Sequence, residues 1–401
     1  MSVDPVTSTV CIVGGGPAGV TLALLLLRQG IPVTLLEAGN DFDRDFRGDT
    51  LSPGVLEIMD EMGLVERLLK LKNGAAVKTV NYVHRDRDWV VADFSRLKSR
   101  FPYLFVLPQR DFLEFMIQEA THLPGFELLM GATVHDLIEK EGIICGVRYK
   151  KNGQSQEICS SLTVGADGRT SRVRKLAGLE MRRMASPIDL ICFRIPRLST
   201  DPAPKALNVY VGDGYYFGIW DRFDYWQINA AIPKGSYAAL RSLGIVHLQK
   251  QLIPVLPELA LRMGGLQWSD VSTLCVEPGM ASRWYRPGLL LIGDAAHVMS
   301  PAGGVGINCA IQDAVATTNV LTLPLRRGDA RLKDLAEVQR IRKWPVWLMQ
   351  KLQDQAQKRL ITKALTTKKY RIPFYMQHSW TRDLATRITG MGINPVHVKR
   401  F

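Results

Sequence analysis

The chain has 401 residues, of which 46% are hydrophobic and 22% charged, so it is long enough for two or three domains with a sizeable core. These proportions, with 34 glycines and 21 prolines, exclude a disordered, collagen-like or coiled-coil chain. The net charge of +13 resides in residues 321–401, which hold 18 Lys and Arg against 5 Asp and Glu. Because the first 320 residues are neutral and contain no known nucleic-acid-binding module, we expect no nucleic-acid partner.

Cysteine spacing and apolar runs bear on metal binding and location. The six cysteines are scattered and form no CxxC or Cys/His pattern, which predicts free thiols in a reducing cytoplasm and no metal site. The start of the chain shows no basic region followed by an apolar run. The longest apolar run, residues 22–27, is far shorter than the roughly 20 residues of a membrane span. We therefore predict a cytoplasmic protein without a leader segment.

A strand–helix–strand unit is predicted at the start of the chain. Residues 9–13 and 31–37 have the short apolar runs of buried strands, and residues 17–29 between them have helical periodicity. Such a unit opens a parallel sheet.

A glycine-rich turn joins the first strand to this helix. Gly14, Gly16 and Gly19 fit G-x-G-x-x-G, where the glycines permit a tight turn, the approach of a pyrophosphate, and close helix–strand packing. The phosphate charge is favoured at the helix N-terminus beside Pro17 and Ala18, where unpaired N–H groups point at it. The pattern predicts a dinucleotide site.

The second predicted strand ends in an acidic residue. Glu37 lies 18 residues after Gly19 and is followed by Ala38. An acidic side chain at this place accepts hydrogen bonds from both ribose hydroxyls, which favours FAD or NAD over NADP. The alternative is a solvated strand end without a ligand.

Two more predicted strands end in an aspartate next to a glycine. Asp167 lies in the first, VGADGRTSRVR at residues 164–174, and Asp294 lies in the second, LIGDAAH at residues 291–297, before the glycine-rich residues 301–308. An aspartate at a strand end can accept hydrogen bonds from a ribityl chain, and a glycine-rich helix N-terminus can stabilise charge on a reduced flavin. An NAD dehydrogenase has no use for this set, so FAD is the predicted cofactor.

The chain between these motifs is rich in strands. Aromatic and β-branched residues alternate with polar ones at residues 74–97 and 186–235, which predicts antiparallel strands. Alternation places Tyr216 and Trp220 on one face of this sheet and Tyr215 on the other, and it leaves open which face meets the flavin. A helical pattern follows at residues 246–263.

A basic helical region is predicted from residue 332 onward, with a break at Pro345 because proline is strained inside a helix. Trp344, Leu348, Leu352 and Ala356 recur every four residues among lysines and arginines, on a helix predicted to run to about residue 365. Two interpretations of this apolar stripe stay open. It packs on the body of the protein, or it lies on a membrane surface.

The motifs GGGPAG, GADGRTSRVR and GDAAHVMSPAGGVGIN, in this order, resemble those of the class A flavoprotein monooxygenases, the superfamily of p-hydroxybenzoate hydroxylase and kynurenine monooxygenase. The resemblance implies an α/β fold with a Rossmann-like FAD-binding domain, an inserted mixed or antiparallel β-sheet substrate domain and a helical C-terminal tail. The expected boundaries are residues 1–73, 98–180 and 270–330 for the FAD-binding domain, 74–97 and 181–269 for the substrate domain, and 331–401 for the basic helical region.

The resemblance also assigns site residues. Beyond Gly14, Gly16, Pro17, Ala18, Gly19, Glu37 and Ala38, the residues that it places at FAD are Arg47, Gln109, Arg110, Asp167, Gly293, Asp294, Pro301, Gly304, Gly306, Ile307 and Asn308. The candidates for the substrate pocket are Tyr216, Trp220, Gln227, Pro301 and His297. Within its motif His297 is largely structural, and no substrate base is assigned.

The resemblance implies that NADPH or NADH docks transiently to reduce FAD, since the chain has no second Rossmann motif. The reduced flavin would form a hydroperoxide with O2 and hydroxylate or epoxidise an aromatic or polycyclic, lipophilic small molecule in a dry pocket. A weak peripheral contact of the basic C-terminal helix with a membrane is part of this prediction, and the oligomeric state stays open.

Three alternatives remain at this point. A flavin-dependent halogenase normally shows Trp-x-Trp-x-Ile-Pro, and residues 226–233 lack the second Trp. An FAD-dependent reductase or dehydrogenase of a natural-product intermediate would need no oxygen. A flavin-bound binding module would have no turnover.

Overall fold

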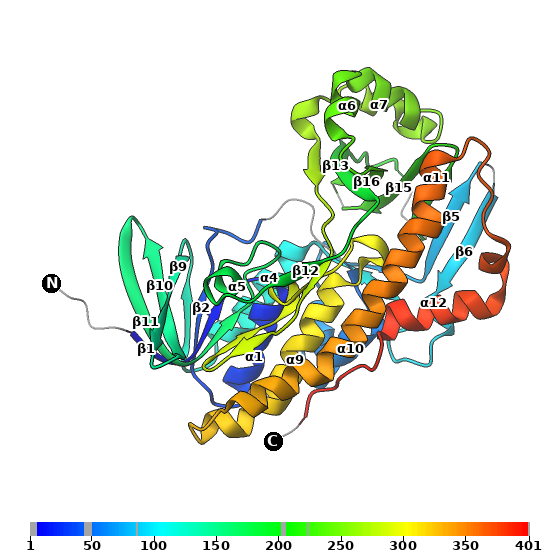
Figure 1. Cartoon of the computed structure of the whole chain (residues 1–401). Coiled ribbons are helices and arrows are strands. Elements are labelled where there is room, and N and C mark those ends of the chain that lie inside the picture. The colour runs from blue at the N-terminus through cyan, green and yellow to red at the C-terminus, as the bar shows by residue number, and fades with distance from the viewer. Residues whose placement is uncertain (1–5, 44–49, 86, 202–205, 223, 400–401) are drawn as a thin grey trace.

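A computed structural model describes residues 6–43, 50–85, 87–201, 206–222 and 224–399 (Figure 1). Within these residues the strands form four sheets. A larger, mostly parallel sheet and a seven-stranded, mostly antiparallel sheet stand apart, and long C-terminal helices run between them (Figure 1).

The larger sheet contains the predicted strand–helix–strand unit. In spatial order its strands are β19 (Tyr285–Arg286), β20 (Leu289–Leu291), β11 (Gln154–Gly165), β1 (Val6–Val13), β2 (Val33–Leu36) and β8 (Phe126–Leu129), with β10 (Ile143–Lys151) and β9 (Thr133–Lys140) attached to β11. The strands from β20 to β8 run parallel. Their apolar runs are expected, because other elements cover both faces of such a parallel sheet.

Helices α1 (Pro17–Arg28), α4 (Gln109–Thr121) and α9 (Gly306–Arg326) pack together against this sheet, with α1 in contact with the other two. Leu24 and Ile311 belong to the main apolar core that results. Removal of this apolar surface from water is the main source of stability for the parallel sheet.

The register of the parallel strands aligns their carboxyl ends. Val13 pairs with Leu36 on one side and with Gly165 on the other, and Gly165 pairs with Leu291. The three predicted motifs and Glu37 follow these ends directly. Ligands of open parallel sheets bind outside such ends, and we call this place the strand-end edge.

The seven-stranded sheet confirms the antiparallel strands predicted at residues 74–97 and 186–235. Its order is β17 (Ser272–Leu274), β13 (Ile188–Pro196), β16 (Tyr225–Pro233), β15 (Tyr215–Asp221), β14 (Leu207–Gly212), β5 (Thr79–His84) and β6 (Arg87–Asp93). Only the pair of β14 with β5 is parallel.

The two faces of this sheet have different neighbours. The outer face, with Phe217 and Tyr215, packs on an apolar cluster that contains Leu248. The inner face, with Tyr216, clusters with Ala302 of the third motif. The face of Tyr216 and Trp220 is therefore the one turned toward the strand-end edge, and its contact with the flavin stays a prediction.

The helices over the outer face are α6 (Tyr237–Ser242), α7 (Ile245–Leu252) and α8 (Ala260–Met263). The helical pattern predicted at residues 246–263 is thus divided between two short helices. Pro254 follows the end of α7, and proline disfavours helical conformation in the residue before it.

Short elements complete the layers. Two three-stranded sheets contain β3 (Thr50–Leu51), β7 (Leu104–Val106) and β4 (Ala75–Val77), and β12 (Met181–Arg183), β18 (Gly279–Ala281) and β21 (His297–Val298). The remaining helices before α9 are α2 (Pro53–Glu61), α3 (Val65–Leu68) and α5 (Arg172–Leu176).

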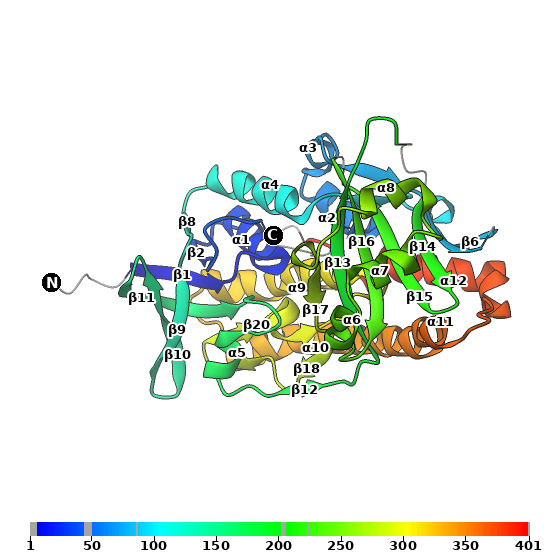
Figure 2. The same cartoon turned by 90° about the horizontal axis from the view of Figure 1, so that it is seen from above.

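The C-terminal region is helical, as predicted, and bridges the two large sheets. Its elements are α10 (Leu332–Ala356), a π-helical turn (Gln357–Ile361), α11 (Thr362–Thr366) and α12 (Ser379–Met391). Seen from above, α10 runs beside α9 and leads into α11 near β15 (Figure 2). No helix in the described part of the chain is long and apolar enough to cross a membrane.

The predicted break at Pro345 is wrong, because α10 continues through this residue. Pro345 lies on the buried side of the helix, and Arg342 before it and Gln350 after it form side-chain hydrogen bonds with the body of the protein. These contacts on both sides offset the backbone hydrogen bond that proline cannot donate.

Of the two interpretations of the apolar stripe, packing on the body of the protein does not hold for Trp344 and Leu352. Trp344 is 56% exposed and Leu352 is 39% exposed. The buried side of α10 instead contains Arg342, Met349 and Gln353. An apolar pattern alone could not indicate this, since buried polar side chains are stable when they are hydrogen-bonded.

Candidate active site

The backbone after β1 leaves no room for side chains. Gly14 has a φ of 110°, and a Cβ there would overlap the carbonyl of Ala166. A Cβ on Gly19 would overlap the carbonyl oxygen of Gly14, so α1 approaches the turn this closely only with glycine. Gly16 is the N-cap of α1 and Pro17 follows it, with no side-chain cap for the first-turn N–H groups. This cradle fits a pyrophosphate.

Glu37 is buried at the end of β2, which excludes the solvated strand end considered above. Its Oε2 accepts a hydrogen bond from the N–H of Gly15 at 2.7 Å, and its Oε1 accepts one from the N–H of Gly39 at 2.8 Å. Each carboxylate oxygen has a second lone pair. Glu37 can therefore hold the glycine turn and accept ribose hydroxyls at the same time, while Ala38 beside it is exposed.

The turn after β20 brings Asp294 to the glycine cradle. A Cβ on Gly293 would lie 3.0 Å from the Cβ of Ala18, so this turn packs directly on α1. Arg169 donates from Nε to Oδ2 of Asp294 at 3.3 Å, and both side chains are partly exposed. Sequence reasoning missed Arg169 as a site residue, although it directly follows the Asp-Gly pair of the second motif.

Asp167 has a local structural role. Its Oδ1 accepts a hydrogen bond from Oγ of Ser171 at 2.5 Å, and its Oδ2 accepts from the N–H groups of Arg172 at 2.7 Å and Val173 at 3.0 Å. Burial raises the pKa of this carboxyl, and these hydrogen bonds offset only part of the effect. Asp167 thus holds the start of α5 and the turn that presents Arg169, and its contact with FAD stays a prediction.

A buried charged cluster lies behind the Gly293 turn. We call Asp313, His297 and Arg342 the Asp313 cluster. Asp313 accepts hydrogen bonds from the N–H of Gly293 at 2.9 Å, from Nε2 of His297 at 2.5 Å and from Nε of Arg342 at 2.8 Å. All three side chains are at most 1% exposed. Arg342 comes from α10, and no motif in the sequence indicated it.

Burial alone would raise the pKa of Asp313, but the charges and hydrogen bonds of His297 and Arg342 outweigh burial, so the pKa lies below its ordinary value. His297, a predicted pocket candidate, lies in this cluster with its ring 5.0 Å from that of Trp284. The cluster therefore fixes the turn that presents Asp294.

The loop at residues 300–304 is held by α10. Gly303 and Gly304 have positive φ angles of 79° and 63°. Gln353 accepts a hydrogen bond from the N–H of Ser300 at 3.2 Å and donates to the carbonyls of Ser300 at 2.8 Å and Ala302 at 2.6 Å. One glutamine of the C-terminal region thus fixes the backbone around Pro301, which is half-buried.

We expect Gln353→Ala to lower the free energy of unfolding by about 1–3 kcal/mol, because it leaves buried backbone groups of residues 300 and 302 without a partner. Urea unfolding measures this loss. Gln355→Ala on the exposed side of the same helix is the matched control and should leave stability unchanged. Equal stability of the two variants would contradict this role of Gln353.

The start of α9 closes the strand-end edge beside β3. Gly306 is the first residue of α9 and Ile307 is buried behind it. Asn308 accepts a hydrogen bond from the N–H of Ser52 at 3.2 Å. A Cβ on Gly304 would lie 3.4 Å from Oγ1 of Thr50. These contacts place the predicted FAD loop, residues 304–308, directly beside β3.

The inner face of the seven-stranded sheet combines aromatic and polar groups. The hydroxyl of Tyr216 lies 3.2 Å from that of Tyr82, and burial raises the pKa of Tyr216. Gln227 is buried, donates to Oδ1 of Asn229 at 3.3 Å and accepts from Nε of Arg222 at 3.4 Å. Asn229 lies on a strand already predicted to form the pocket wall, and Arg222, just after the end of β15, extends this set.

Three further predicted site residues, Gln109, Arg110 and Trp220, lie within the described part of the chain. Arg47 lies outside the described residues. Gln109 is the first residue of α4, and the exposed Arg110 pairs with Glu114 at 2.7 Å, which raises the pKa of the guanidinium. Trp220 lies over Gly218 on the inner face.

Together, the glycine cradle, the buried Glu37 and the partly exposed Asp294 fit FAD. All six cysteines are free thiols. Across the described ranges, no group of three or more His, Cys, Asp and Glu side chains could hold a metal ion.

Comparison with known proteins agrees with this geometry. The family model described as FAD binding domain matches residues 7–212 and 255–349. The 6-methylpretetramide 4-monooxygenase of Streptomyces rimosus is 37% identical over 330 residues, which are 81% of this chain and 78% of that protein.

Two solved structures show the same fold. The p-nitrophenol 4-monooxygenase PnpA of Pseudomonas putida DLL-E4 has a TM-score of 0.76 and 19% identity, with 96% of each chain covered. The flavin-dependent brominase Bmp2 has a TM-score of 0.78 and 17% identity, with 96% of this chain and 93% of that chain covered. At such identities the brominase shows the fold alone and adds no support for a halogenase. The predicted fold is confirmed, and the chain belongs to the FAD binding domain family as a class A flavoprotein monooxygenase.

Proposed function

We propose that this monooxygenase takes electrons from NADPH or NADH, uses O2, and hydroxylates or epoxidises an aromatic or polycyclic, lipophilic small molecule. The observation that supports this proposal is that Tyr216 on the inner face and Ala302 in the loop that leaves the strand-end edge pack against the same apolar cluster. A flavin at the edge and a substrate on the inner face would meet there. When bound, FAD supplies electron transfer to O2 and the transfer of one oxygen atom.

The residues of the chain would bind, orient and shield. Glu37 would hold the adenosine ribose and Asp294 the ribityl chain, with Arg169 beside it. The apolar groups of Ala231 and Ile361 in the cluster around Tyr216 would exclude water. These assignments, and the predicted domain boundaries, are part of the proposal.

The polar groups of the inner face would orient the substrate. Gln227 and Asn229 lie on the same strand, two residues apart, so their amides point to the same face. They can bind a hydroxyl or carbonyl group of a substrate. The substrate in the name of the Streptomyces rimosus relative makes 6-methylpretetramide the first compound to test.

The test is to purify the protein, record its absorption spectrum, and follow oxidation of NADPH and NADH with 6-methylpretetramide and a panel of phenols and polycyclic aromatics. We expect bound FAD, oxidation stimulated by substrate, and one atom of isotope-labelled O2 in the product. A chloride-dependent product that requires a flavin reductase would instead indicate a halogenase. A product without added oxygen would indicate a reductase or dehydrogenase.

A pair of variants tests the placement of the substrate. Tyr216→Ala on the inner face should raise the KM for the substrate roughly tenfold, because it removes part of the pocket wall. Tyr215→Ala on the outer face is the matched control and should leave KM unchanged. The reverse result would contradict the proposed pocket.

The predicted cytoplasmic location and the contact of the C-terminal region with a membrane also stay proposals. The exposed side of α10 carries the residues that would make the membrane contact.

A further inference from the structure

One side of α10 exposes two tryptophans on successive turns. Arg340, Lys343, Trp344, Trp347 and Lys351 share this side, which we call the tryptophan face. Trp344 is 56% exposed and Trp347 is 46% exposed. A shallow hollow is lined by Arg340, Lys343 and the two indoles. The spacing of three, four and seven residues places these side chains on one face of the helix.

The tryptophan face is not needed to attach α10 to the protein. The opposite side of the helix provides Arg342 to the Asp313 cluster, Gln350 to the carbonyls of Gly279 and Val298, and Gln353 to the loop at residues 300–302. The indoles therefore remain available for a partner outside the chain.

Exposed tryptophan is concentrated in the C-terminal region. Trp344, Trp347 and Trp380 are the exposed tryptophans among the described residues, and all three follow residue 331. Scattered apolar side chains are common on protein surfaces, but two indoles that border one hollow form a patch. Removal of the two indoles from water would favour association.

Cations surround the indoles. Nζ of Lys351 lies 5.9 Å from the centre of the Trp347 ring, and Nζ of Lys343 donates to the carbonyl of Ser282. The acidic residues beside the face are already paired, Glu337 with Arg340 and Asp354 with Lys358.

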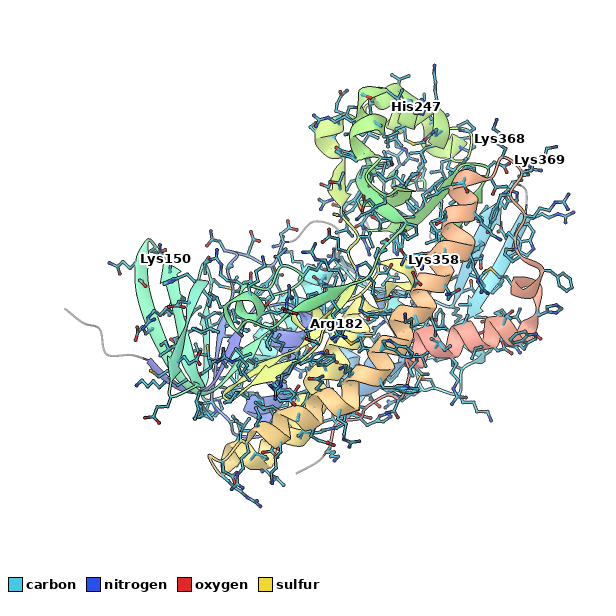
Figure 3. The ribbon with its side chains drawn as sticks, viewed as in Figure 1. Lys150, Arg182, His247, Lys358, Lys368 and Lys369 are labelled. Atoms are coloured by element: carbon cyan, nitrogen blue, oxygen red, sulfur yellow. The ribbon has the colours of Figure 1, made fainter. Side chains whose placement is uncertain are left out.

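The positive charge continues along the helical run. Figure 3 shows Lys358 along the run of α10 and α11, and Lys368 and Lys369 at its far end. This charge belongs to the C-terminal residues that hold 18 Lys and Arg against 5 Asp and Glu.

We propose that the tryptophan face docks on an anionic lipid membrane. Indole rings settle at the level of lipid headgroups, and lysine and arginine next to them are attracted to anionic lipids. A helix with this composition on one side lies in the plane of the interface and does not span the bilayer. The proposal goes beyond the reaction and does not depend on the identity of the substrate.

Charge decides between a membrane and a second copy of the chain. In a two-fold symmetric contact the same patch meets itself. Lys343 and Lys351 would then face their own copies, and this repulsion opposes association. An anionic surface instead satisfies the cations while it covers the indoles.

The test is cosedimentation of the full-length holoprotein with vesicles of phosphatidylglycerol and phosphatidylcholine in equal amounts. We expect binding at low salt, weaker binding at high salt, and little binding to phosphatidylcholine alone. Trp344→Ser/Trp347→Ser and Lys343→Gln/Lys351→Gln should each weaken binding about tenfold or more. Tryptophan fluorescence of the native protein should shift to the blue with anionic vesicles.

The matched control removes two cations elsewhere. Lys150→Gln/Lys250→Gln changes exposed lysines of β10 and α7, two elements that lie away from α10 (Figure 1), and should bind vesicles as the native protein does. The FAD absorption spectrum checks that each variant is folded. Equal binding by all variants would overturn the proposal. So would a dimer in sedimentation velocity that Trp344→Ser/Trp347→Ser converts to a monomer while native protein ignores anionic vesicles.

Discussion

Asp313→Asn is expected to lower the free energy of unfolding by about 3–5 kcal/mol and to weaken FAD binding, because it leaves the guanidinium of Arg342 buried without its counter-charge. Arg342 is 1% exposed, so water cannot replace the lost carboxylate. Asparagine offers one acceptor oxygen to donors that use both oxygens of Asp313, among them the N–H of Gly293, so the turn that presents Asp294 loses part of its support. Urea unfolding and a fluorescence titration with FAD measure the two effects.

Two arginines of α10, one buried and one exposed, separate the effect of the Asp313 cluster from the effect of losing any arginine of this helix. Arg342→Gln should destabilise the protein strongly, whereas Arg340→Gln, two residues away on the exposed side, should not change the unfolding midpoint. The double variant Asp313→Asn/Arg342→Gln should lose less than the sum of the single variants, because the two side chains interact directly. Additive losses would show that the cluster is not a unit.

The Asp313 cluster also predicts the response to acid. The pKa of Asp313 is lowered in the folded protein, so its contribution to stability is present above the pKa of the unfolded chain. This contribution is lost as the pH falls through the lower pKa of the folded state. Native protein should therefore lose more stability than Asp313→Asn over that acidic interval.

Asp294→Asn is expected to weaken FAD binding by roughly 10–100-fold, because the ribityl hydroxyls lose a charged acceptor. The side chain is 26% exposed, so the fold should survive. Equilibrium dialysis with FAD and the absorption spectrum of the purified variant measure the loss.

Asp136→Asn is the control for this substitution. Asp136 is also paired with an arginine, Arg148 at 2.9 Å, but it lies on β9. It should retain FAD as the native protein does. If Asp294→Asn purified yellow with normal FAD affinity and activity, the assignment of Asp294 to the cofactor would be wrong.

Local rules predicted the strand-end edge well. The glycines after β1 are required by backbone contacts between near neighbours in the fold, so their spacing indicates the turn directly. The strand ends at Asp167 and Asp294 could be predicted for the same reason. The resemblance then gave the order of the domains, because the three motifs occur in the order typical of the superfamily.

Side-chain partners from distant elements could not be predicted. Arg342 and Gln353 are polar residues in a helix with an apolar stripe, and nothing in that pattern indicates that they are buried. Their burial depends on Asp313 and on the carbonyls near Ser300, which only the tertiary structure brings to α10. The predicted helix break at Pro345 is wrong for a related reason. Rules for proline describe an isolated helix, whereas α10 is held by side-chain hydrogen bonds on both sides of Pro345.

The strand-end edge also constrains when the protein can fold during synthesis. Val13 of β1 pairs with Gly165 of β11, and Gly165 pairs with Leu291 of β20. The central sheet is therefore incomplete until most of the chain has left the ribosome. The Asp313 cluster can form only later, because Arg342 follows β20 in the chain. Such nonlocal pairing slows folding and leaves apolar strands exposed in partial chains. A nascent chain that stops before α10 would therefore expose apolar strands to chaperones, and it would lack the Arg342 that completes the support of the Gly293 turn.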